Sequence, residues 1–215
     1  MTTTRVRLRF SKQQDLRQIG HRDLLRTLER QLRRAGLPLA MSQGFHPKPK
    51  LSFPLALAVG IAGNEEVMEL ELAEEMTAEQ VLAALAPQCP PGLQFRSAEV
   101  LPPGTKSGAV ARVVYEFPLP APQIEPLRLR IAEALSAAAL VVRREDRDLS
   151  IDIRPMIDDL SIEATPAGDA VLRFALRTSP GEVGARPREV LQALGAEALE
   201  AEGCFLTRTT VELKS

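Results

Sequence analysis

Residues 5–10, Arg5-Val6-Arg7-Leu8-Arg9-Phe10, alternate strictly between a basic and an apolar side chain. Because successive side chains of a β-strand point to opposite faces, this period of two predicts a strand with one buried face. The three arginines then lie on the opposite face. They form either the solvent side of an antiparallel sheet, where charge also protects an edge against aggregation, or a surface that binds phosphate through planar guanidinium groups.

The segment that follows, residues 21–35, has the period of a helix. Its apolar positions recur at helical spacing, and Gly36 and then Pro38 end the pattern as a left-handed cap and a helix breaker. A second face carries a basic stripe, part of which is ordinary solvation because Asp23 and Glu29 can pair with arginines on the next turn. The stripe consists of Arg22, Arg26, Arg30 and Arg33 or Arg34.

The same signals continue along the chain and repeat one order of elements: strand, helix, strand, strand, helix, strand. In the first half they predict strands at 51–58, 67–72 and 93–101 and a helix at 77–85 that Thr77 caps. The second half repeats the order with one or two added strands. It has strands at 112–119, 140–144, 150–155, 160–164, 170–177 and 205–213, and helices at 124–135 and 187–194.

This order predicts an α+β fold of two tandem ferredoxin-like units, each an antiparallel sheet with helices packed on one face. The basic N-terminal unit covers residues 1–101, residues 102–109 form a Pro- and Gly-rich linker, and the acidic C-terminal unit covers residues 110–215. The length of 215 residues suits two units of about 100 residues each. Element order alone supports the duplication, because the halves share no visible sequence identity.

The net charge of −1 hides an asymmetry along the chain. Residues 1–60 contain twelve Lys and Arg and three acids, which gives +9, whereas the remainder contains 15 and 25, which gives −10. A basic segment of this kind indicates an anionic partner, or it packs against the acidic remainder of its own chain.

Several classes of protein are disfavoured by what the sequence lacks. No apolar run approaches the roughly 20 residues of a membrane span, and no signal peptide is visible, so we expect a cytoplasmic protein without a membrane partner. Cys89 and Cys204 lack the spacing of metal or cluster ligands, so we expect reduced thiols, no metal and no cofactor.

Residues 42–50, SQGFHPKPK, combine backbone restriction with cations. Gly44 permits a close ligand approach, and Pro47 and Pro49 hold the backbone extended. Such a chain at a sheet edge would project three potential cations and a hydroxyl to one side, which suits an anion; structural rigidity alone is the alternative. These four side chains are His46, Lys48, Lys50 and Ser52.

His21 and His46 are the two histidines of the chain. If they flank one anionic site, they can serve as the acid and base of metal-free phosphodiester cleavage; otherwise each is a structural residue. Seven Phe, one Tyr and no Trp leave little material for stacking on bases, although Phe45 and Phe53 flank the basic loop. We therefore expect recognition of shape or backbone phosphate rather than of bases.

The stretches RLRFSK, HRDLLRTLERQLRRAGLPLAMSQGFHPKPKLSFPLALAVG and EVMELEL resemble the radical-SAM-linked protein family, closely over residues 5–72 and more loosely beyond. The resemblance implies a companion of a radical S-adenosylmethionine (SAM) protein and supplies no established catalytic residues. The chain lacks a Cys-x3-Cys-x2-Cys motif and a dinucleotide-type glycine loop, so radical chemistry must come from a partner chain.

Polar positions that match the family pattern, together with the helix and loop cations, give the predicted substrate-binding set: Arg9, Lys12, Arg22, Ser42, Gln43, Gly44, His46, Lys48 and Lys50.

Three functions fit these observations. The first is a non-enzymatic accessory protein that presents an anionic substrate, foremost RNA, to a radical SAM partner. The second is a metal-independent RNA-processing enzyme, by analogy with CRISPR repeat-processing endoribonucleases, which place a histidine on tandem ferredoxin-like domains. The third is an interaction module whose basic surface binds an acidic protein.

Overall fold

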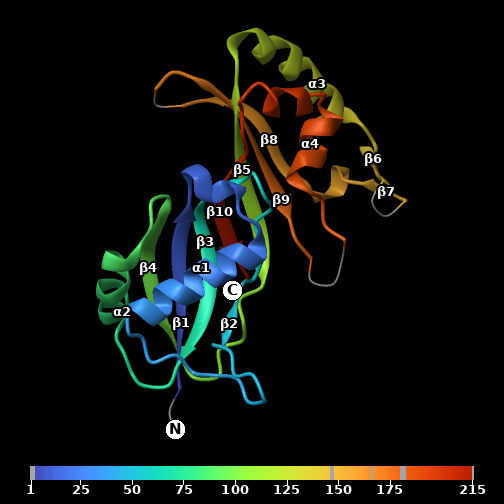
Figure 1. Ribbon diagram of the computed structural model, residues 1–215. Coiled ribbons are helices and arrows are strands. Elements are labelled where there is room, and N and C mark those ends of the chain that lie inside the picture. The colour runs from blue at the N-terminus through green and yellow to red at the C-terminus, as the bar shows by residue number, and fades with distance from the viewer. Residues whose placement is uncertain (1–2, 146–147, 166, 180–182, 215) are drawn as a thin grey trace. The chain divides into compact units, whose positions relative to one another are not determined.

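The computed structural model describes residues 3–145, 148–165, 167–179 and 183–214. The chain forms two compact units, Met1–Ala109 and Val110–Ser215. It is a mixed α+β protein with antiparallel strands, and the described residues contain four α-helices (Figure 1). None of the helices in this part of the chain is both long and apolar enough to cross a membrane.

The first unit contains a sheet in the order β4-β1-β3-β2, in which every neighbouring pair is antiparallel. Its strands are β1 (Thr4–Lys12), β2 (Leu51–Ser52), β3 (Ala62–Leu72) and β4 (Leu93–Leu101). The strand predicted from the alternating arginines is therefore the central strand β1, held between two long neighbours.

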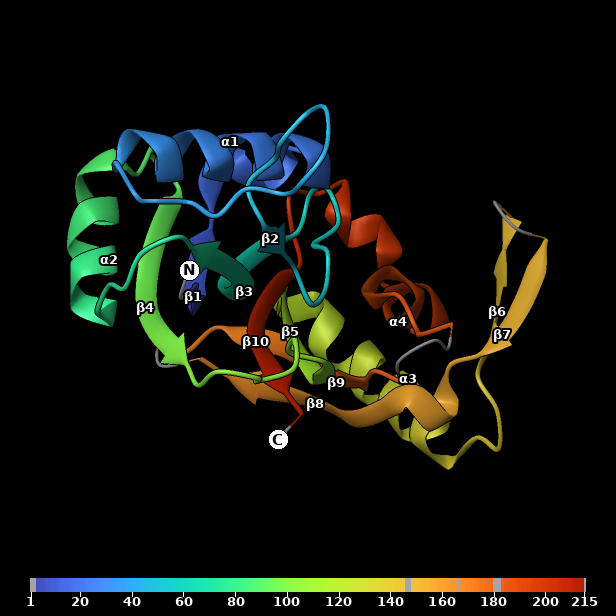
Figure 2. The same ribbon diagram turned by 90° about the horizontal axis from the view of Figure 1, so that it is seen from below.

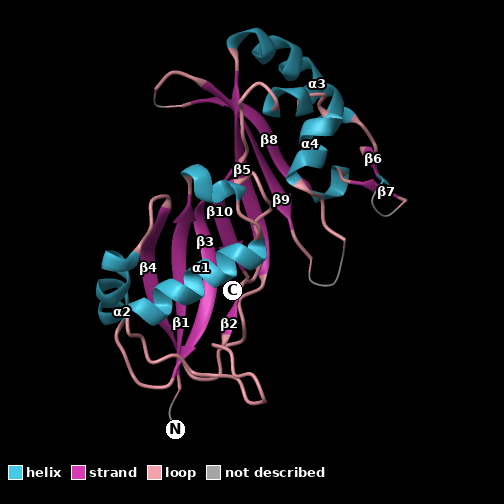
Figure 3. Cartoon of the chain, in the orientation of Figure 1, coloured by secondary structure: helices cyan, strands magenta, loops and turns pink. Residues whose placement is uncertain are grey.

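Two helices, α1 (His21–Arg34) and α2 (Ala78–Leu85), lie on one face of this sheet (Figures 2 and 3). The apolar side chains of β1 point toward them and are fully buried, together with the apolar stripe of α1. This core explains why the alternation and the helical period appear together in the sequence: each pattern supplies one side of the same interior. Its centre contains Val6, Leu8, Phe10, Leu24, Leu28 and Leu32.

The end of α1 and the start of α2 are as the sequence predicts. After α1, Gly36 adopts φ +68°, and the amides of Gly36 and Leu37 donate to the carbonyls of Arg33 and Leu32, which is the Schellman arrangement. At the start of α2, the Thr77 hydroxyl accepts from the Gln80 amide at 3.3 Å, and the Gln80 side chain accepts from the Thr77 amide at 2.8 Å.

The strand predicted at 51–58 is wrong over most of its length. Only Leu51 and Ser52 pair with β3, and the chain then leaves the sheet. Pro54 has no amide proton for the strand ladder, which explains the early end.

The second unit contains a sheet in the order β10-β5-β9-β8, again with antiparallel neighbours. Its strands are β5 (Val110–Leu119), β8 (Ile157–Ala164), β9 (Ala170–Arg177) and β10 (Thr207–Leu213). The helices of this unit are α3 (Ile124–Ser136) and α4 (Pro187–Ala193).

The added strands of the second half form a separate ribbon, β6 (Val141–Arg144) with β7 (Leu149–Asp152). A buried ion pair ties this ribbon to α4, since Arg144 Nη2 lies 2.8 Å from Glu189 Oε2. The predicted strand 150–155 ends at Asp152 because Pro155 lies in a 3₁₀ turn. Short 3₁₀ turns in the described part of the chain include Gln14–Gln18, Ala86–Gln88, Ala121–Gln123, Arg154–Met156 and Glu197–Glu200.

Candidate anion-binding site

The arginines of β1 lie on the sheet face opposite the helices, where carboxylates of the same unit meet them. Arg5 Nη2 is 2.7 Å from Glu69 Oε2, and Arg7 Nη2 is 2.9 Å from Glu69 Oε1. Arg7 and Glu69 are direct neighbours in the β1–β3 register, and the Glu69 side chain is only 2% exposed. One buried carboxylate thus holds two guanidinium groups.

The rest of this face is also neutralised. Arg7 pairs with Glu99 at 3.2 Å, and Arg9 pairs with Glu65 at 3.5 Å. The whole first unit contains fourteen Lys and Arg and eleven acids, so much of the N-terminal charge excess is balanced within the unit itself. The β1 arginines are therefore explained by pairing, without a ligand.

The segment predicted as a linker is fixed to this same face. The Gly108 amide donates to Glu69 Oε1 at 3.0 Å, while Arg5 donates to the Thr105 carbonyl and to Ser107 Oγ. Residues 105–108 therefore lie against the sheet of the first unit.

Lys12, a member of the predicted binding set, is fully buried. Its ammonium donates to the carbonyl of Ile19 at 2.9 Å and to that of Arg17 at 3.3 Å. These bonds join the end of β1 to the segment that leads into α1. The position gives Lys12 a structural role, and it is not included in the site argued below.

The arginines on the outer face of α1 differ from those of β1 in their exposure and in their ion pairs. All five of its arginines are exposed: Arg22, Arg26, Arg30, Arg33 and Arg34. Asp23 lies 3.3 Å from Arg26 and Glu29 lies 3.0 Å from Arg33, so two arginines have partners on the helix itself. Within the described part of the chain, Arg22, Arg30 and Arg34 make no ion pair.

Four of these arginines follow one another at intervals of four residues: Arg22, Arg26, Arg30 and Arg34. Residues at this spacing are neighbours on a helix, and like charges there destabilise it by a few tenths of a kcal/mol per pair. The row extends over about 18 Å at the helical rise per residue. A helix selected for stability alone would place acids between these arginines, so we interpret the row, here called the arginine ladder, as a site that requires positive charge.

The loop 42–48 does not have the predicted extended form. The Ser42 amide donates to the Lys48 carbonyl at 2.8 Å, and the Lys48 amide donates to Ser42 Oγ at 3.0 Å. Met41 and Pro49 form an antiparallel bridge below this closure. The chain therefore reverses direction within the loop, because Gly44 takes φ +133°, a conformation that glycine adopts readily.

The side chains that were expected to converge have different surroundings. Lys50 leaves the set because its ammonium pairs with Glu71 at 2.7 Å. Gln43, His46 and Lys48 are exposed on the loop, and the Lys48 side chain makes no ion pair among the described residues. Ser42 closes the loop, which is a positioning role.

The two histidines occupy different environments. His21 begins α1, is half-buried, and its ring meets Phe53 edge-on with centroids 5.1 Å apart. Phe53 in turn contacts Phe10 of the core at 6.4 Å. His46 is exposed on the loop, and in the part of the chain that the structure describes no hydrogen bond or ring contact joins the two histidines. The geometry provides no assembled acid–base pair.

The thiols are not arranged as nucleophiles either. Burial raises the pKa of the Cys204 thiol, and the nearby Glu202 carboxylate raises this pKa further. Cys89 directs its sulfur toward the Leu85 carbonyl at 3.6 Å. A raised thiol pKa disfavours the reactive thiolate.

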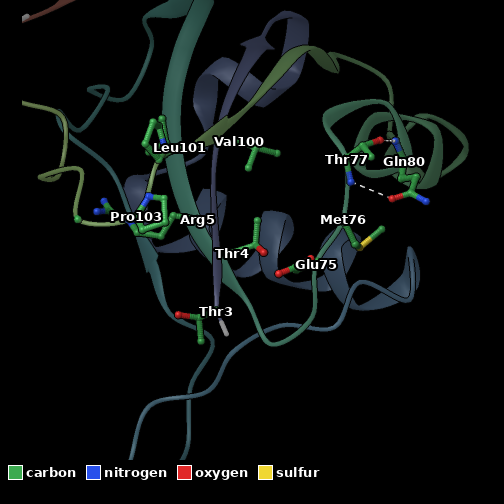
Figure 4. A pocket seen from close by; sticks show the side chains of 12 residues that line it. Thr3, Thr4, Arg5, Glu75, Met76, Thr77, Gln80, Val100, Leu101 and Pro103 are labelled. Atoms are coloured by element: carbon green, nitrogen blue, oxygen red, sulfur yellow. Dashed lines mark hydrogen bonds between the residues drawn. The ribbon is translucent and has the colours of Figure 1, made fainter. Parts of the chain in front are cut away.

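A cavity of about 520 Å³ lies between the start of β1, the start of α2 and the end of β4 (Figure 4). Among the described residues that line it, Arg5 is the one cation, Glu75 is an acid, and Val100, Leu101 and Met76 give it apolar walls. It contains none of the predicted site residues. Its lining does not suit an anion, so the arginine ladder and the exposed part of the loop 42–48 form the candidate site.

Comparison with known proteins places the chain in a family. A model described as an uncharacterized protein conserved in bacteria (DUF2344) matches residues 5–185, and the chain belongs to this family. The description of the family names no activity, substrate or partner. No curated protein matches the chain.

Among solved structures, 22 chains match. One is the crystal structure of an unknown protein from Galdieria sulphuraria, 12% identical over 100% of both chains with a TM-score of 0.27. At that TM-score the likeness supports no inference about fold or function.

Proposed function

We propose that the first unit binds the phosphate backbone of RNA through the arginine ladder of α1 and presents this RNA to a radical SAM partner. The observation that carries the proposal is the ladder itself: exposed arginines at four-residue spacing, three of which have no ion pair among the described residues. Guanidinium groups match the geometry of phosphate oxygens, and a linear row of them suits a repeating phosphate chain. The protein acts as an accessory without catalysis of its own.

We further propose that both units are ferredoxin-like. The strand orders β4-β1-β3-β2 and β10-β5-β9-β8 support this, because each follows the 4-1-3-2 order expected when a β-α-β-β-α-β unit forms an antiparallel sheet. The ribbon of β6 and β7 is then an insertion in the second unit. In the first unit this arrangement leaves the outer side of α1 as a solvent-facing layer, which keeps the ladder accessible.

The chain lacks the cysteine motif of radical SAM proteins, so a partner chain must supply the radical chemistry. The resemblance of residues 5–72 to the radical-SAM-linked family supports a radical SAM protein as the companion that supplies the reaction. We accordingly propose that the protein acts in the cytoplasm, where RNA is available.

The proposal is tested by fluorescence anisotropy with a labelled single-stranded RNA. The variant Arg22→Ala/Arg30→Ala/Arg34→Ala removes the unpaired arginines, and we expect it to weaken affinity about a hundredfold at low salt. The control is Arg128→Ala/Arg143→Ala/Arg177→Ala, which removes the same formal charge from exposed positions of the second unit, where each arginine pairs with a carboxylate.

Equal weakening by both triple variants would contradict a defined site. If the wild type does not bind RNA, the RNA proposal fails. An acidic protein that is still pulled down after nuclease treatment, and that is lost when the ladder is removed, would then be the ligand instead of RNA.

A further inference from the structure

Phe45 occupies an unusual position for an aromatic side chain. It lies in the loop 42–48 and is 102% exposed, as open to solvent as in an extended chain. It is the one exposed aromatic residue in the described part of the chain, since the other Phe residues and Tyr115 are buried or half-buried. The fold does not use this ring, so its exposure requires another explanation.

The loop holds the ring away from the unit on a fixed frame. Two bonds between Ser42 and Lys48 close the loop, the Lys50 amide donates to the Ala40 carbonyl at 2.9 Å, and Pro49 at its base is buried. Pro47 restricts the backbone immediately after the exposed part. A preordered frame lowers the entropy that is lost when the ring binds.

The surroundings of Phe45 distinguish between ligands. Gln43, His46 and Lys48 are exposed beside it on the same loop, so the ring is interleaved with polar and cationic groups. A protein-binding anchor is normally surrounded by contacts that exclude water, whereas the one other exposed large apolar side chain among residues 41–50 is Met41 at the base of the loop. An isolated aromatic beside cations is instead typical of single-strand binding, in which the ring stacks on a base and the cations contact phosphate.

The loop also lies on the appropriate side of the first unit. Figure 2 shows the loop, which leads into the start of β2, on the side of the sheet that α1 covers. A single strand that follows the arginine ladder can therefore meet Phe45 on the same side.

We propose that Phe45 stacks on an unpaired base and that the substrate class is single-stranded RNA, with Lys48 and His46 next to the adjoining phosphate. This inference rests on the proposed RNA binding by α1 and revises the expectation that bases are not contacted. A base within a duplex is already stacked on its neighbours and cannot accept the ring, so the proposal predicts a preference for single strands.

The first test compares Phe45→Ala with the wild type on an oligouridine strand and on an RNA duplex. We expect about a tenfold loss of affinity for the single strand and no change for the duplex. Leu129→Ala, which removes another exposed apolar side chain in the second unit, should change neither affinity.

The second test uses the absence of tryptophan from the chain. Phe45→Trp introduces a single indole, and stacking predicts that oligouridine quenches its fluorescence while an abasic strand of equal charge does not. The variant should also restore the affinity that Phe45→Ala loses.

The outcomes separate the two proposals. If RNA still binds through the ladder but Phe45→Ala has wild-type affinity and the indole is not quenched, stacking is overturned and RNA binding stands. If no RNA binds, both proposals fail.

Discussion

The first unit contains two sets of arginines that the sequence makes look alike and the structure makes different. On β1, Arg5 and Arg7 converge on the buried carboxylate of Glu69 and lie under the segment 105–108. On α1, Arg22, Arg30 and Arg34 point into solvent and have no ion pair among the described residues. Positive charge thus serves assembly on one face and, in the function that we propose, binding on the other, and the carboxylates supplied by the fold account for the difference.

Among the variants that distinguish the β1 arginines from the α1 arginines, loss of Glu69 should have the largest effect on the free energy of unfolding. Glu69→Ala leaves two guanidinium groups and the Gly108 amide without their shared acceptor, so we expect about 3 kcal/mol less free energy of unfolding. Glu99→Ala removes an exposed carboxylate that pairs with Arg7 and should change the free energy of unfolding by less than about 0.5 kcal/mol. Urea unfolding measures both variants, and equal losses would show that Glu69 does not organise this face.

A smaller effect of opposite sign should appear on the helix. Arg30→Glu places a carboxylate between Arg26 and Arg34 and replaces two repulsive pairs with attractive ones, so we expect about 0.5 to 1 kcal/mol more free energy of unfolding. The same change should weaken RNA binding about tenfold, because it inserts a negative charge into the ladder. Urea unfolding and anisotropy on one preparation measure the two effects.

Arg30→Ala is the control for that pair of effects. It relieves the repulsion without adding an ion pair, so both its stabilisation and its loss of affinity should be smaller than those of Arg30→Glu. A helix that becomes less stable with Glu at this position would contradict the view that the ladder opposes stability.

Much of the first unit can be predicted from local sequence. The alternation in residues 5–10 and the helical period of residues 21–35 identify β1 and α1, because each pattern reflects burial of one face. Gly36 and Thr77 mark helix ends through bonds made within a few residues. These features depend on near neighbours, which are visible in one sequence.

The parts that sequence reasoning missed depend on contacts that no periodic pattern in the sequence marks, whether the partners are five to seven residues away or in another strand. Nothing near Lys12 in the chain indicates that its ammonium is buried against backbone carbonyls, and Lys50 is matched with Glu71 only by the register of the sheet. The prolines of residues 42–50 suggested an extended chain, whereas the closure between Ser42 and Lys48 reverses it and exposes Phe45. The four-residue spacing of the arginine ladder was the signal that could have added Arg30 and Arg34 to the proposed site.

The most direct test of the central claim is the salt dependence of RNA affinity, measured for the wild type and the two triple arginine variants. If the ladder contacts phosphates, the slope of log K against log salt for a single strand should be smaller in magnitude by about 2 in Arg22→Ala/Arg30→Ala/Arg34→Ala, because each lost phosphate contact removes about 0.7. The control variant of the second unit should retain the wild-type slope. An unchanged slope in the ladder variant, or an equal reduction in the control, would contradict the assignment of phosphate binding to α1.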